Sequence, residues 1–375
     1  MAHSKMDHDY INSKVSLILP NLSGGGAERV MVILANEFRE TLPQLDLIII
    51  NDDNMDYASE LSDKVNLVNL KTGRAGKSIL SIRKYLIEHQ PDVLLTTLGH
   101  ISCASAIALS ISGNIPTKLF VREDLTPKKV SIKYPFLYAV SILQKWAYKR
   151  ATGIIALSED MASDISRYYK LDTPIHTIYN PITTTEILEK SVKALEPMPP
   201  WPENTKFVLG VGRLAKQKDF RTLITAVSQA RKTHDIKLII LGEGAERQNL
   251  ESHARALNIS DSVFMPGFVE NPFSFMHKSS VFVLSSEREG LPNVLIQALL
   301  CGTKCIATNC PTGPREILEN GAYGKLVSIG DHENIATGIV SCLTDDSIKT
   351  PTPEVIRSKY NSKSIADQYL SVLLN

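Results

Sequence analysis

The feature that most constrains the fold of this chain is a repeated alternation between short apolar segments and longer amphipathic ones. Runs rich in Val, Ile and Leu recur along the whole sequence, as in 15–19, 207–211 and 281–284. Such runs are typical of strands buried on both faces of a parallel sheet, and the amphipathic segments between them are typical of crossover helices. The alternation therefore predicts an α/β protein built from parallel sheets.

The expected strands form two series separated by a proline-rich segment. The first series lies near residues 15–19, 45–50, 65–67, 93–95, 118–121, 153–156 and 176–178, and the second near 207–211, 238–241, 263–265, 281–284, 305–307 and 325–327. Four prolines between 197 and 202 can continue neither a helix nor a strand. We predict a Rossmann-like domain over 1–195, a linker over 196–205, a second Rossmann-like domain over 206–350, and a segment, 351–375, whose helix packs towards the first domain.

Composition limits the classes of function. A length of 375 residues fits two domains, and a net charge of +1 supplies no general field for nucleic acid, so we expect no nucleic-acid partner. Five cysteines without a C-x-x-C pair are typical of buried thiols in a reducing compartment. The polar residues 1–12 do not resemble a signal peptide, and no apolar run is long enough to span a membrane. We expect a cytoplasmic protein.

Three glycines follow the first strand and precede a helical pattern. Gly24, Gly25 and Gly26 would expose backbone N–H groups at the positive end of that helix, which is a suitable site for a phosphate. The alternative is a tight turn that binds no ligand. The segment matches neither G-x-G-x-x-G nor a P-loop.

A second loop, after the first strand of the second half, carries Gly212, Arg213 and Lys218. In an open α/β sheet, ligands bind at this carboxyl edge, and a guanidinium together with an ammonium suits a diphosphate. The alternative is a solvated basic loop. Gly242 and Gly244 form a similar but weaker signal after the next strand.

The most informative stretch runs from 285 to 302, where a strand leads into a helix that begins near Pro292. Glu289 lies in the loop before this helix, and Gln297 lies about two turns into it, near the same face. One ligand could reach both side chains. Alternatively, Glu289 only caps the helix.

Six segments occur in a fixed order along the chain: Gly-Gly-Ala-Glu-Arg-Val, Val-Gly-Arg-Leu-x-x-x-Lys, Gly-Glu-Gly, Glu-Gly-Leu-Pro-Asn-Val-Leu, Cys-Gly-Thr and Gly-Pro-Arg-Glu-Ile-Leu. Taken together and in this order, they resemble the retaining GT-B glycosyltransferases of family 4, in particular bacterial members that build lipid-linked oligosaccharides, lipopolysaccharide and capsular polysaccharides. The resemblance spans about 15–327 and implies two Rossmann-like domains that face each other across a cleft.

The resemblance also implies roles for individual residues. Arg213 and Lys218 would hold the diphosphate of a nucleotide-sugar donor, and Glu289 would meet the donor sugar. Further donor-binding positions are Gly25, Gly26, Gly212, Gly242, Gly290, Leu291, Pro292, Asn293 and Val294. Gln297 is a departure, because the family has a Glu here that bonds the ribose; an amide lacks its charge-assisted bond, so we expect weaker nucleotide contact.

The reaction implied is retaining transfer of a hexose or N-acetylhexosamine from a UDP-linked donor to a lipid-linked or cell-surface glycan acceptor. Two cations would stabilise the leaving diphosphate, so we expect no metal and no other cofactor. The only D-x-D sequence, Asp7-His8-Asp9, precedes the first strand. The departing phosphate oxygen would take the proton of the acceptor hydroxyl.

Two residues at strand ends of the first half are candidates for the acceptor side. Glu123 follows the strand at 118–121; it either touches the acceptor or pairs with Arg122 at the surface. His100 follows the strand at 93–95 and is either an acceptor contact or a structural residue.

The segment Lys118–Arg150 carries eight basic and two acidic residues, a local charge of +6, interleaved with Tyr, Phe, Leu and Trp. This mixture suits the interface of an anionic membrane, so we predict a peripheral protein at its inner face. Alternatively, the segment is a basic helix whose apolar side packs on the first domain.

Two rival functions stay open. One is a glycosyltransferase-like scaffold or regulatory subunit without activity, which the Gln297 departure favours. The other is a sugar-nucleotide epimerase of the same shape. An NAD enzyme is disfavoured because no G-x-G-x-x-G is present.

Overall fold

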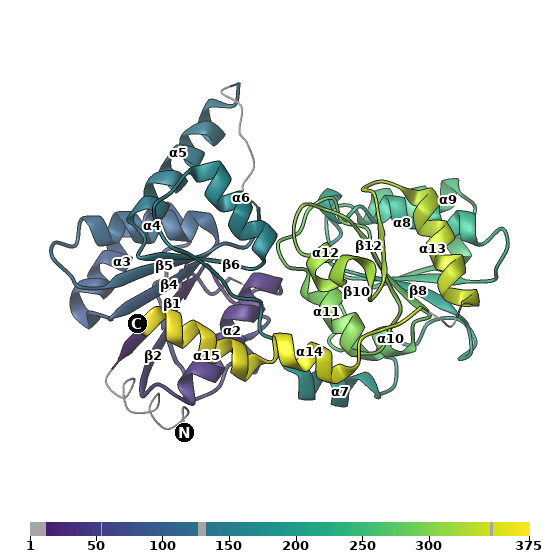
Figure 1. Ribbon diagram of the computed structural model, residues 1–375, viewed down its shortest axis with the longest axis horizontal. Coiled ribbons are helices and arrows are strands. Elements are labelled where there is room, and N and C mark those ends of the chain that lie inside the picture. The colour runs from purple at the N-terminus through teal and green to yellow at the C-terminus, as the bar shows by residue number, and fades with distance from the viewer. Residues whose placement is uncertain (1–12, 54, 127–132, 346–347) are drawn as a thin grey trace. The chain divides into compact units, whose positions relative to one another are not determined.

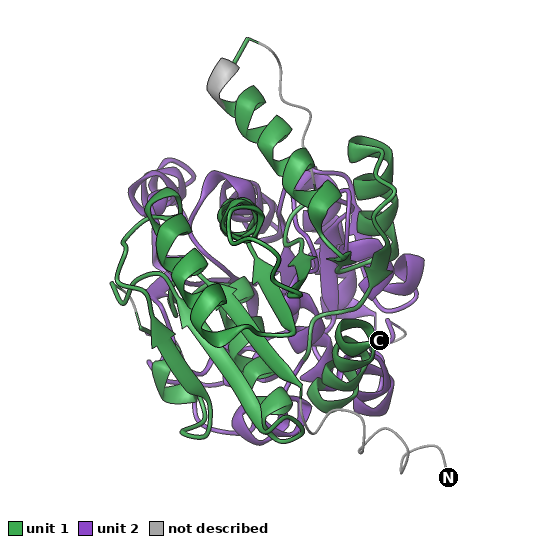
Figure 2. Cartoon of the chain, turned by 90° about the vertical axis from the view of Figure 1, so that its left-hand side faces the viewer, with its two compact units in different colours: residues 1–181, 362–375 green, residues 182–361 purple. Residues whose placement is uncertain are grey.

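The computed structural model describes residues 13–53, 55–126, 133–345 and 348–375. The chain forms two compact units, shown in different colours in Figure 2. Unit 1 comprises the chain up to Pro181 together with 362–375, and unit 2 comprises 182–361. The chain therefore passes from one unit to the other twice.

Unit 1 is built on a parallel sheet of seven strands in the order β3-β2-β1-β4-β5-β6-β7 (Figure 1). The strands are β1 (Lys14–Leu19), β2 (Gln44–Ile49), β3 (Asn66–Asn69), β4 (Val93–Thr97), β5 (Lys118–Arg122), β6 (Gly153–Ala156) and β7 (Ile175–Thr177). Each neighbouring pair is parallel. All seven expected strands are present. The inner strands β4 and β6 are fully buried, as the inside of a parallel sheet requires, whereas the edge strands β3 and β7 are only partly buried or exposed.

The helices of unit 1 form two groups. They are α2 (Gly26–Arg39), α3 (Ala75–His89), α4 (Gly99–Ser110), α5 (Pro135–Arg150), α6 (Glu159–Tyr169) and α15 (Ser362–Leu374). Helices α3, α4 and α5 pack in sequence, whereas the C-terminal helix α15 packs on α2. Tyr369 and Leu373 of α15 are fully buried in the core that α2 and the strands share. The predicted C-terminal helix is thus part of unit 1.

Unit 2 repeats the architecture with six parallel strands in the order β10-β9-β8-β11-β12-β13. They are β8 (Phe207–Val211), β9 (Lys237–Leu241), β10 (Val263–Gly267), β11 (Val281–Leu284), β12 (Cys305–Thr308) and β13 (Lys325–Val327). Its helices are α7 (Thr184–Ser191), α8 (Phe220–Ala230), α9 (Arg247–Ala256), α10 (Pro272–Lys278), α11 (Asn293–Leu300), α12 (Pro314–Ile317), α13 (His332–Thr344) and α14 (Pro353–Tyr360). This is the strand order of a nucleotide-binding Rossmann fold.

The passage between the units differs from the expected boundary. The first crossing lies at 181/182, because α7 packs on α10 and α11, and Asn271 Nδ2 donates to the Lys190 carbonyl at 2.9 Å. The proline-rich segment 196–205 lies within unit 2 rather than between the units. Trp201 attaches this segment by packing edge-to-face against Phe264, with ring centroids 6.1 Å apart. The second crossing lies at 361/362, so 351–361 belong to unit 2.

Candidate functional site

The sheet order of unit 2 creates one position where loops diverge. The chain extends outward from β8 in one direction and from β11 in the other, so the loops that follow these two strands leave their carboxyl ends on opposite sides. Ligands of open α/β sheets bind in the crevice at such a switch point. Arg213 and Lys218 follow β8, and Glu289 follows β11. The three residues assigned to the donor diphosphate and sugar thus lie on the two loops of this switch point.

Lys218 and Glu289 form an ion pair at this edge. Lys218 Nζ donates to Glu289 Oε1 at 2.6 Å, and the Ser286 hydroxyl donates to the same oxygen at 2.6 Å. Glu289 is buried, with 7% of its surface exposed. A carboxylate can remain buried when a cation and a hydroxyl compensate for lost water. Oε2 has no hydrogen-bond partner in the described part of the chain, so it can accept from a ligand.

The two loops are also joined through their backbones. The Ser285 hydroxyl donates to the Lys218 carbonyl at 2.8 Å, and the Gln217 amide donates to the Arg288 carbonyl at 2.7 Å. The Glu287 N–H donates to the Gln217 carbonyl at 2.8 Å. Each loop therefore fixes the other, which holds the ion pair in place before any ligand binds.

Arg213 differs from Lys218 in being uncommitted, that is, not engaged in an ion pair or hydrogen bond with another described residue. Its side chain is exposed, and within the described residues it has no ion pair or hydrogen bond. A guanidinium presents donors in a planar fork that matches two phosphate oxygens. Lys216, on the same loop, is exposed as well.

Gly212 and Gly242 have a structural reason to be glycine. Gly242 has φ +132°, and a Cβ atom there would lie 2.1 Å from the Gly212 carbonyl oxygen. The Gly212 N–H donates to the Leu241 carbonyl at 2.9 Å. These glycines allow the loops after β8 and β9 to approach each other closely.

The segment after Glu289 leads into α11, as expected. Gly290, Leu291 and Pro292 are buried, and Asn293 and Val294 are half-buried at the start of the helix. The N-cap of α11 is Pro292, and the Glu289 carboxylate bonds Lys218 and Ser286 rather than the helix N–H groups, so the alternative in which Glu289 acts as a cap is wrong. Thr312 Oγ1 donates to the Glu289 carbonyl at 2.7 Å and fixes the loop from the neighbouring element.

Gln297 is placed on the second turn of α11 and is 8% exposed. Its side-chain amide has no hydrogen-bond partner among the described residues. An amide that is not bonded to the protein can donate to and accept from a ligand or water. The position is therefore compatible with a ligand hydroxyl.

The glycine turn of unit 1 holds two carboxylates. Gly25 is the N-cap of α2, and Gly26 is its first residue. The Gly24 N–H donates to Asp56 Oδ2 at 2.7 Å, and a Cβ atom on Gly25 would lie 2.1 Å from Glu28 Oε2. In this structure the acids Asp56 and Glu28 lie beside the N–H groups predicted to approach a phosphate, so that role stays a prediction.

Glu123 lies in a buried cluster, not at the surface. Arg122 is fully buried and pairs with Asp124, so the alternative of a surface ion pair between Arg122 and Glu123 is wrong. The Tyr148 hydroxyl donates to Glu123 Oε2. Burial is the largest influence on this carboxyl and raises the pKa of Glu123 to about 7. An acid tuned in this way at the carboxyl edge of a sheet is a candidate functional group.

His100 occupies the first turn of α4 and is exposed. The residue before it, Gly99, packs against Gln144 of α5: a Cβ on Gly99 would lie 2.7 Å from Gln144 Nε2. Gln144 also donates to the Tyr148 hydroxyl at 2.7 Å. The two acceptor-side candidates, Glu123 and His100, are therefore on segments that contact the same helix.

Sequence reasoning missed Ser286, Gln144 and Tyr148. Ser286 precedes Glu289 by three residues in the same loop, and this short spacing could have indicated that its hydroxyl bonds the carboxylate. Gln144 and Tyr148 are one helical turn apart in α5 and belong to no recognisable sequence motif. Their role depends on which strand end they meet, and sequence spacing does not give that.

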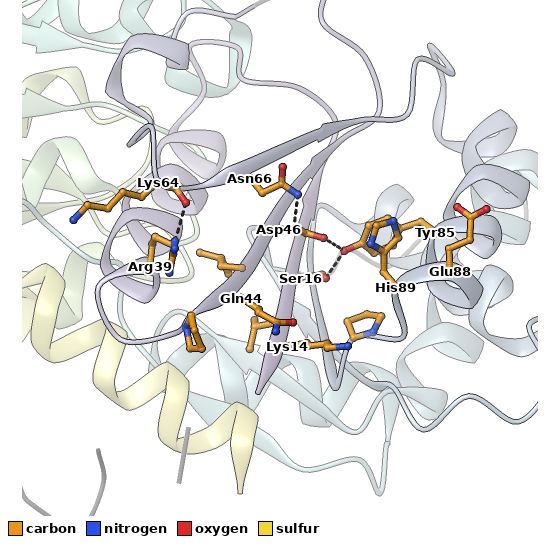
Figure 3. A pocket seen from close by; sticks show the side chains of 14 residues that line it. Lys14, Ser16, Arg39, Gln44, Asp46, Lys64, Asn66, Tyr85, Glu88 and His89 are labelled. Carbon is orange, nitrogen blue, oxygen red and sulfur yellow. Dashed lines mark hydrogen bonds between the residues drawn. The ribbon is translucent and has the colours of Figure 1, made fainter. Parts of the chain in front are cut away.

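A polar hollow lies elsewhere in unit 1. It has a volume of about 430 Å³ and is found at the amino-terminal edge of the sheet, where Lys14, Gln44 and Asn66 begin or flank strands (Figure 3). Asp46 on its wall accepts from Asn66 at 2.7 Å and from the Tyr85 hydroxyl. This edge is opposite to the one with the candidate residues.

Two features are absent from the described residues: a cluster that could hold a metal ion and a helix that could span a membrane. Residues 13–53, 55–126, 133–345 and 348–375 contain no group of three or more His, Cys, Asp or Glu arranged to hold a metal ion. The D-x-D sequence Asp7-His8-Asp9 lies outside the described residues. Within the same described part, none of the helices combines the length and apolar character needed to cross a bilayer.

Comparison with known proteins places both units. Residues 24–186 match the family described as Glycosyltransferase Family 4, and residues 193–360 match the family described as Glycosyl transferases group 1. HepE of Anabaena, solved in complex with UDP, superposes with a TM-score of 0.77 at 18% identity, over 96% of this chain and 99% of that one. This similarity shows that the fold is that of GT-B proteins.

Curated relatives cover nearly the full chain. The N-acetylgalactosamine-N,N'-diacetylbacillosaminyl-diphospho-undecaprenol 4-alpha-N-acetylgalactosaminyltransferase of Campylobacter jejuni is 28% identical, over 90% of this chain and 92% of the relative. The lipopolysaccharide 1,6-galactosyltransferase of Escherichia coli is 28% identical, over 86% and 87%. With one family matched in each unit and the fold in agreement, the chain belongs to the GT-B glycosyltransferases that combine a family 4 domain with a group 1 domain.

Proposed function

We propose that this glycosyltransferase moves a hexose or N-acetylhexosamine from a UDP-linked donor to a lipid-linked or lipopolysaccharide-type acceptor. The observation that carries the proposal is the Lys218–Glu289 pair at the switch point of unit 2, with the uncommitted Arg213 on the same loop as Lys218. Two relatives named above are an N-acetylgalactosaminyltransferase named for a saccharide on diphospho-undecaprenol and a lipopolysaccharide galactosyltransferase, which supports both substrate classes.

In this proposal, each donor group meets a residue with matching chemistry. Arg213 and Lys218 bind the diphosphate, Glu289 accepts from sugar hydroxyls through Oε2, and Gln297 bonds the ribose. The backbone from Gly290 to Val294 lies at the start of α11, where helix N–H groups favour negative charge. Donor binding changes the partner of Lys218 from Glu289 alone to Glu289 and a phosphate oxygen.

We further propose that transfer proceeds with retention and without a metal ion. The bond between the anomeric carbon and the β-phosphate oxygen breaks, and its electron pair stays on the phosphate. The acceptor oxygen bonds to the anomeric carbon from the same face, and its proton passes to the departing phosphate oxygen. Arg213 and Lys218 stabilise the growing charge; removal of one such preorganised donor typically costs about 3 to 4 kcal/mol of barrier.

Association with an anionic membrane is part of the proposal, with fewer charges than the sequence suggested. Arg122 is buried and cannot contact lipid, and Lys128 and Lys129 lie outside the described residues. Lys145 is half-buried, while Lys149 and Arg150 at the end of α5 are exposed. The acceptors named in the relatives are membrane-linked, which is consistent with a peripheral location at the inner face.

The test is a transfer assay with the purified chain, a panel of UDP-hexoses and UDP-N-acetylhexosamines, and undecaprenyl diphosphate-linked saccharides as acceptors. We expect one donor to give a product with the anomeric configuration of the donor, as read by NMR, in the presence of a chelator. Binding of UDP without transfer or hydrolysis would favour the scaffold function. Interconversion of the donor without transfer would favour the epimerase.

A further inference from the structure

Helix α5 has two halves with different environments. In the first half, apolar side chains are exposed around the whole helix; in the second, Ala147 and Tyr148 are fully buried. The exposed apolar side chains are Leu137, Tyr138, Val140, Ile142 and Leu143, with Tyr134 just before the helix. Figures 1 and 2 both show α5 extending outward from the rest of unit 1. Exposed apolar side chains gathered on one helical segment indicate a binding surface.

The charge of this region specifies the partner. No Asp or Glu occurs between Lys133 and Arg150, whereas Lys145, Lys149 and Arg150 follow the apolar half. The Arg150 guanidinium lies 4.7 Å from the centre of the Trp146 ring. Apolar side chains followed by cations and an aromatic ring match a bilayer with anionic headgroups: the apolar part enters the acyl boundary, and each cation near the surface contributes about 1 kcal/mol.

The inner half of α5 is bonded to the end of β5. Tyr148 donates its hydroxyl proton to Glu123 Oε2, and Gln144 Nε2 lies 2.7 Å from the Tyr148 oxygen and 3.4 Å from Glu123 Oε2. Tyr148 packs edge-on against Tyr169, with ring centroids 5.1 Å apart. These bonds leave Glu123 little freedom to move independently of α5.

The same inner face touches the start of α4. Gly99 lies so close to Gln144 that a Cβ atom would clash with the amide at 2.7 Å. Gly99 immediately precedes His100 and follows Leu98, whose N–H donates to Asp124 at 2.9 Å. Gln144 therefore contacts both loops at the carboxyl edge that carry the acceptor-side candidates.

From this arrangement, we propose that α5 couples lipid binding to the acceptor side of unit 1, with Gln144 and Tyr148 as the positioning residues. When the outer half of α5 enters an anionic bilayer, Gln144 and Tyr148 fix the loops that carry Glu123 and His100. The assignment of these loops to the acceptor rests on the proposed function. The coupling itself does not, because it is a property of unit 1 alone.

Hydrogen exchange tests the coupling without donor or acceptor. The chain is measured with and without vesicles of phosphatidylcholine containing about one third phosphatidylglycerol. We expect vesicles to slow exchange at 137–143 through direct burial, and also at 97–104 and 119–125, by about threefold or more, through the loss of local opening. Pure phosphatidylcholine vesicles should give a smaller effect at all three segments, because the cations then have no partner.

Variants separate coupling from lipid binding. In Gln144→Ala we expect the slowing at 137–143 to persist and the slowing at 97–104 and 119–125 to disappear; Tyr148→Phe serves as a second variant that keeps the ring. Ser141→Ala is the matched control on α5, because its hydroxyl bonds only the Tyr138 carbonyl. The proposal is overturned if vesicles do not slow 137–143, if they slow 137–143 alone in the wild type, or if both variants retain all three effects. Lack of transferase activity would not affect this measurement.

Discussion

The Lys218 ammonium group donates to Glu289 over 2.6 Å, although the two residues are 71 positions apart in the sequence. One is assigned to the donor diphosphate and the other to the donor sugar, so the ion pair joins the two parts of the proposed site. Because each charge largely neutralises the other, the net positive charge of this edge comes from exposed cations of the same loop, among them Arg213. The Lys218–Glu289 pair gives structure to the site, and Arg213 gives it net positive charge.

Arg213→Ala should lower kcat of transfer by about 10²- to 10³-fold, because one preorganised donor to the leaving group is lost. The midpoint of urea unfolding should not change, since the Arg213 side chain has no partner in the described structure. Lys216→Ala is the control, because Lys216 is an exposed cation on the same loop. Equal loss of rate in both variants would mean that only loop charge matters.

Lys218→Ala should destabilise unit 2 by about 1 to 3 kcal/mol, because Glu289 stays buried after losing its cation. Adding Glu289→Gln should recover part of that stability without recovering transfer. Urea unfolding of the wild type, both single variants and the double variant gives the coupling energy. Additive effects would show that the ion pair contributes nothing to stability.

Gln297→Glu should bind UDP about three- to tenfold more tightly, because a carboxylate forms a charge-assisted bond with a ribose hydroxyl. Titration calorimetry with UDP measures the change. Gln297→Leu is the matched control and should bind UDP more weakly than the wild type. If all three proteins bind UDP equally, position 297 does not contact the nucleotide.

The raised pKa of Glu123 predicts that stability falls as pH rises. The folded state holds the proton up to about pH 7, because burial disfavours the carboxylate, whereas the unfolded chain releases it near the ordinary value of 4.5. Between pH 4.5 and pH 7, the free energy of unfolding of the wild type should therefore fall by roughly 3 kcal/mol relative to that of Glu123→Gln.

Urea unfolding of both proteins across this pH range tests the Glu123 prediction. The ionisable groups that face this carboxyl are Arg122 on its own strand, Cys103 on α4, Tyr148 on α5 and Tyr169 on α6. The three thiol and phenol groups stay protonated here, because burial raises their pKa. If the difference in free energy of unfolding between the two proteins is constant with pH, the raised pKa of Glu123 is contradicted.

Leu373→Ala should destabilise unit 1 by about 2 to 5 kcal/mol, because the fully buried side chain fixes α15 against the core. Val372→Ala, at a half-buried position next to it, is the control and should cost clearly less. Urea denaturation measures the free energy of unfolding of both variants. Equal and small effects would show that α15 is dispensable for the stability of unit 1.

The elements of this fold follow from local sequence. Strand, turn and helix are recognised from side-chain periodicity and glycine or proline positions within a few residues, and every expected strand is present, as are the helix near Pro292 and the helix that contains Tyr369. The loops with Arg213, Lys218 and Glu289 were predictable for the same reason, since each directly follows an apolar run. In contrast, the proline-rich segment had the composition of a linker but lies within unit 2, where Trp201 packs on Phe264.

By itself, then, the sequence determined which segments become strands and helices, and which side chains stand at their ends, because those preferences are local. Only the tertiary structure decided the partners: Lys218 with Glu289, Arg122 with Asp124 in place of Glu123, and Glu123 with Tyr148. Such pairs depend on strand order and helix packing. These bring together residues distant in sequence and bury some charges that spacing alone would place in water.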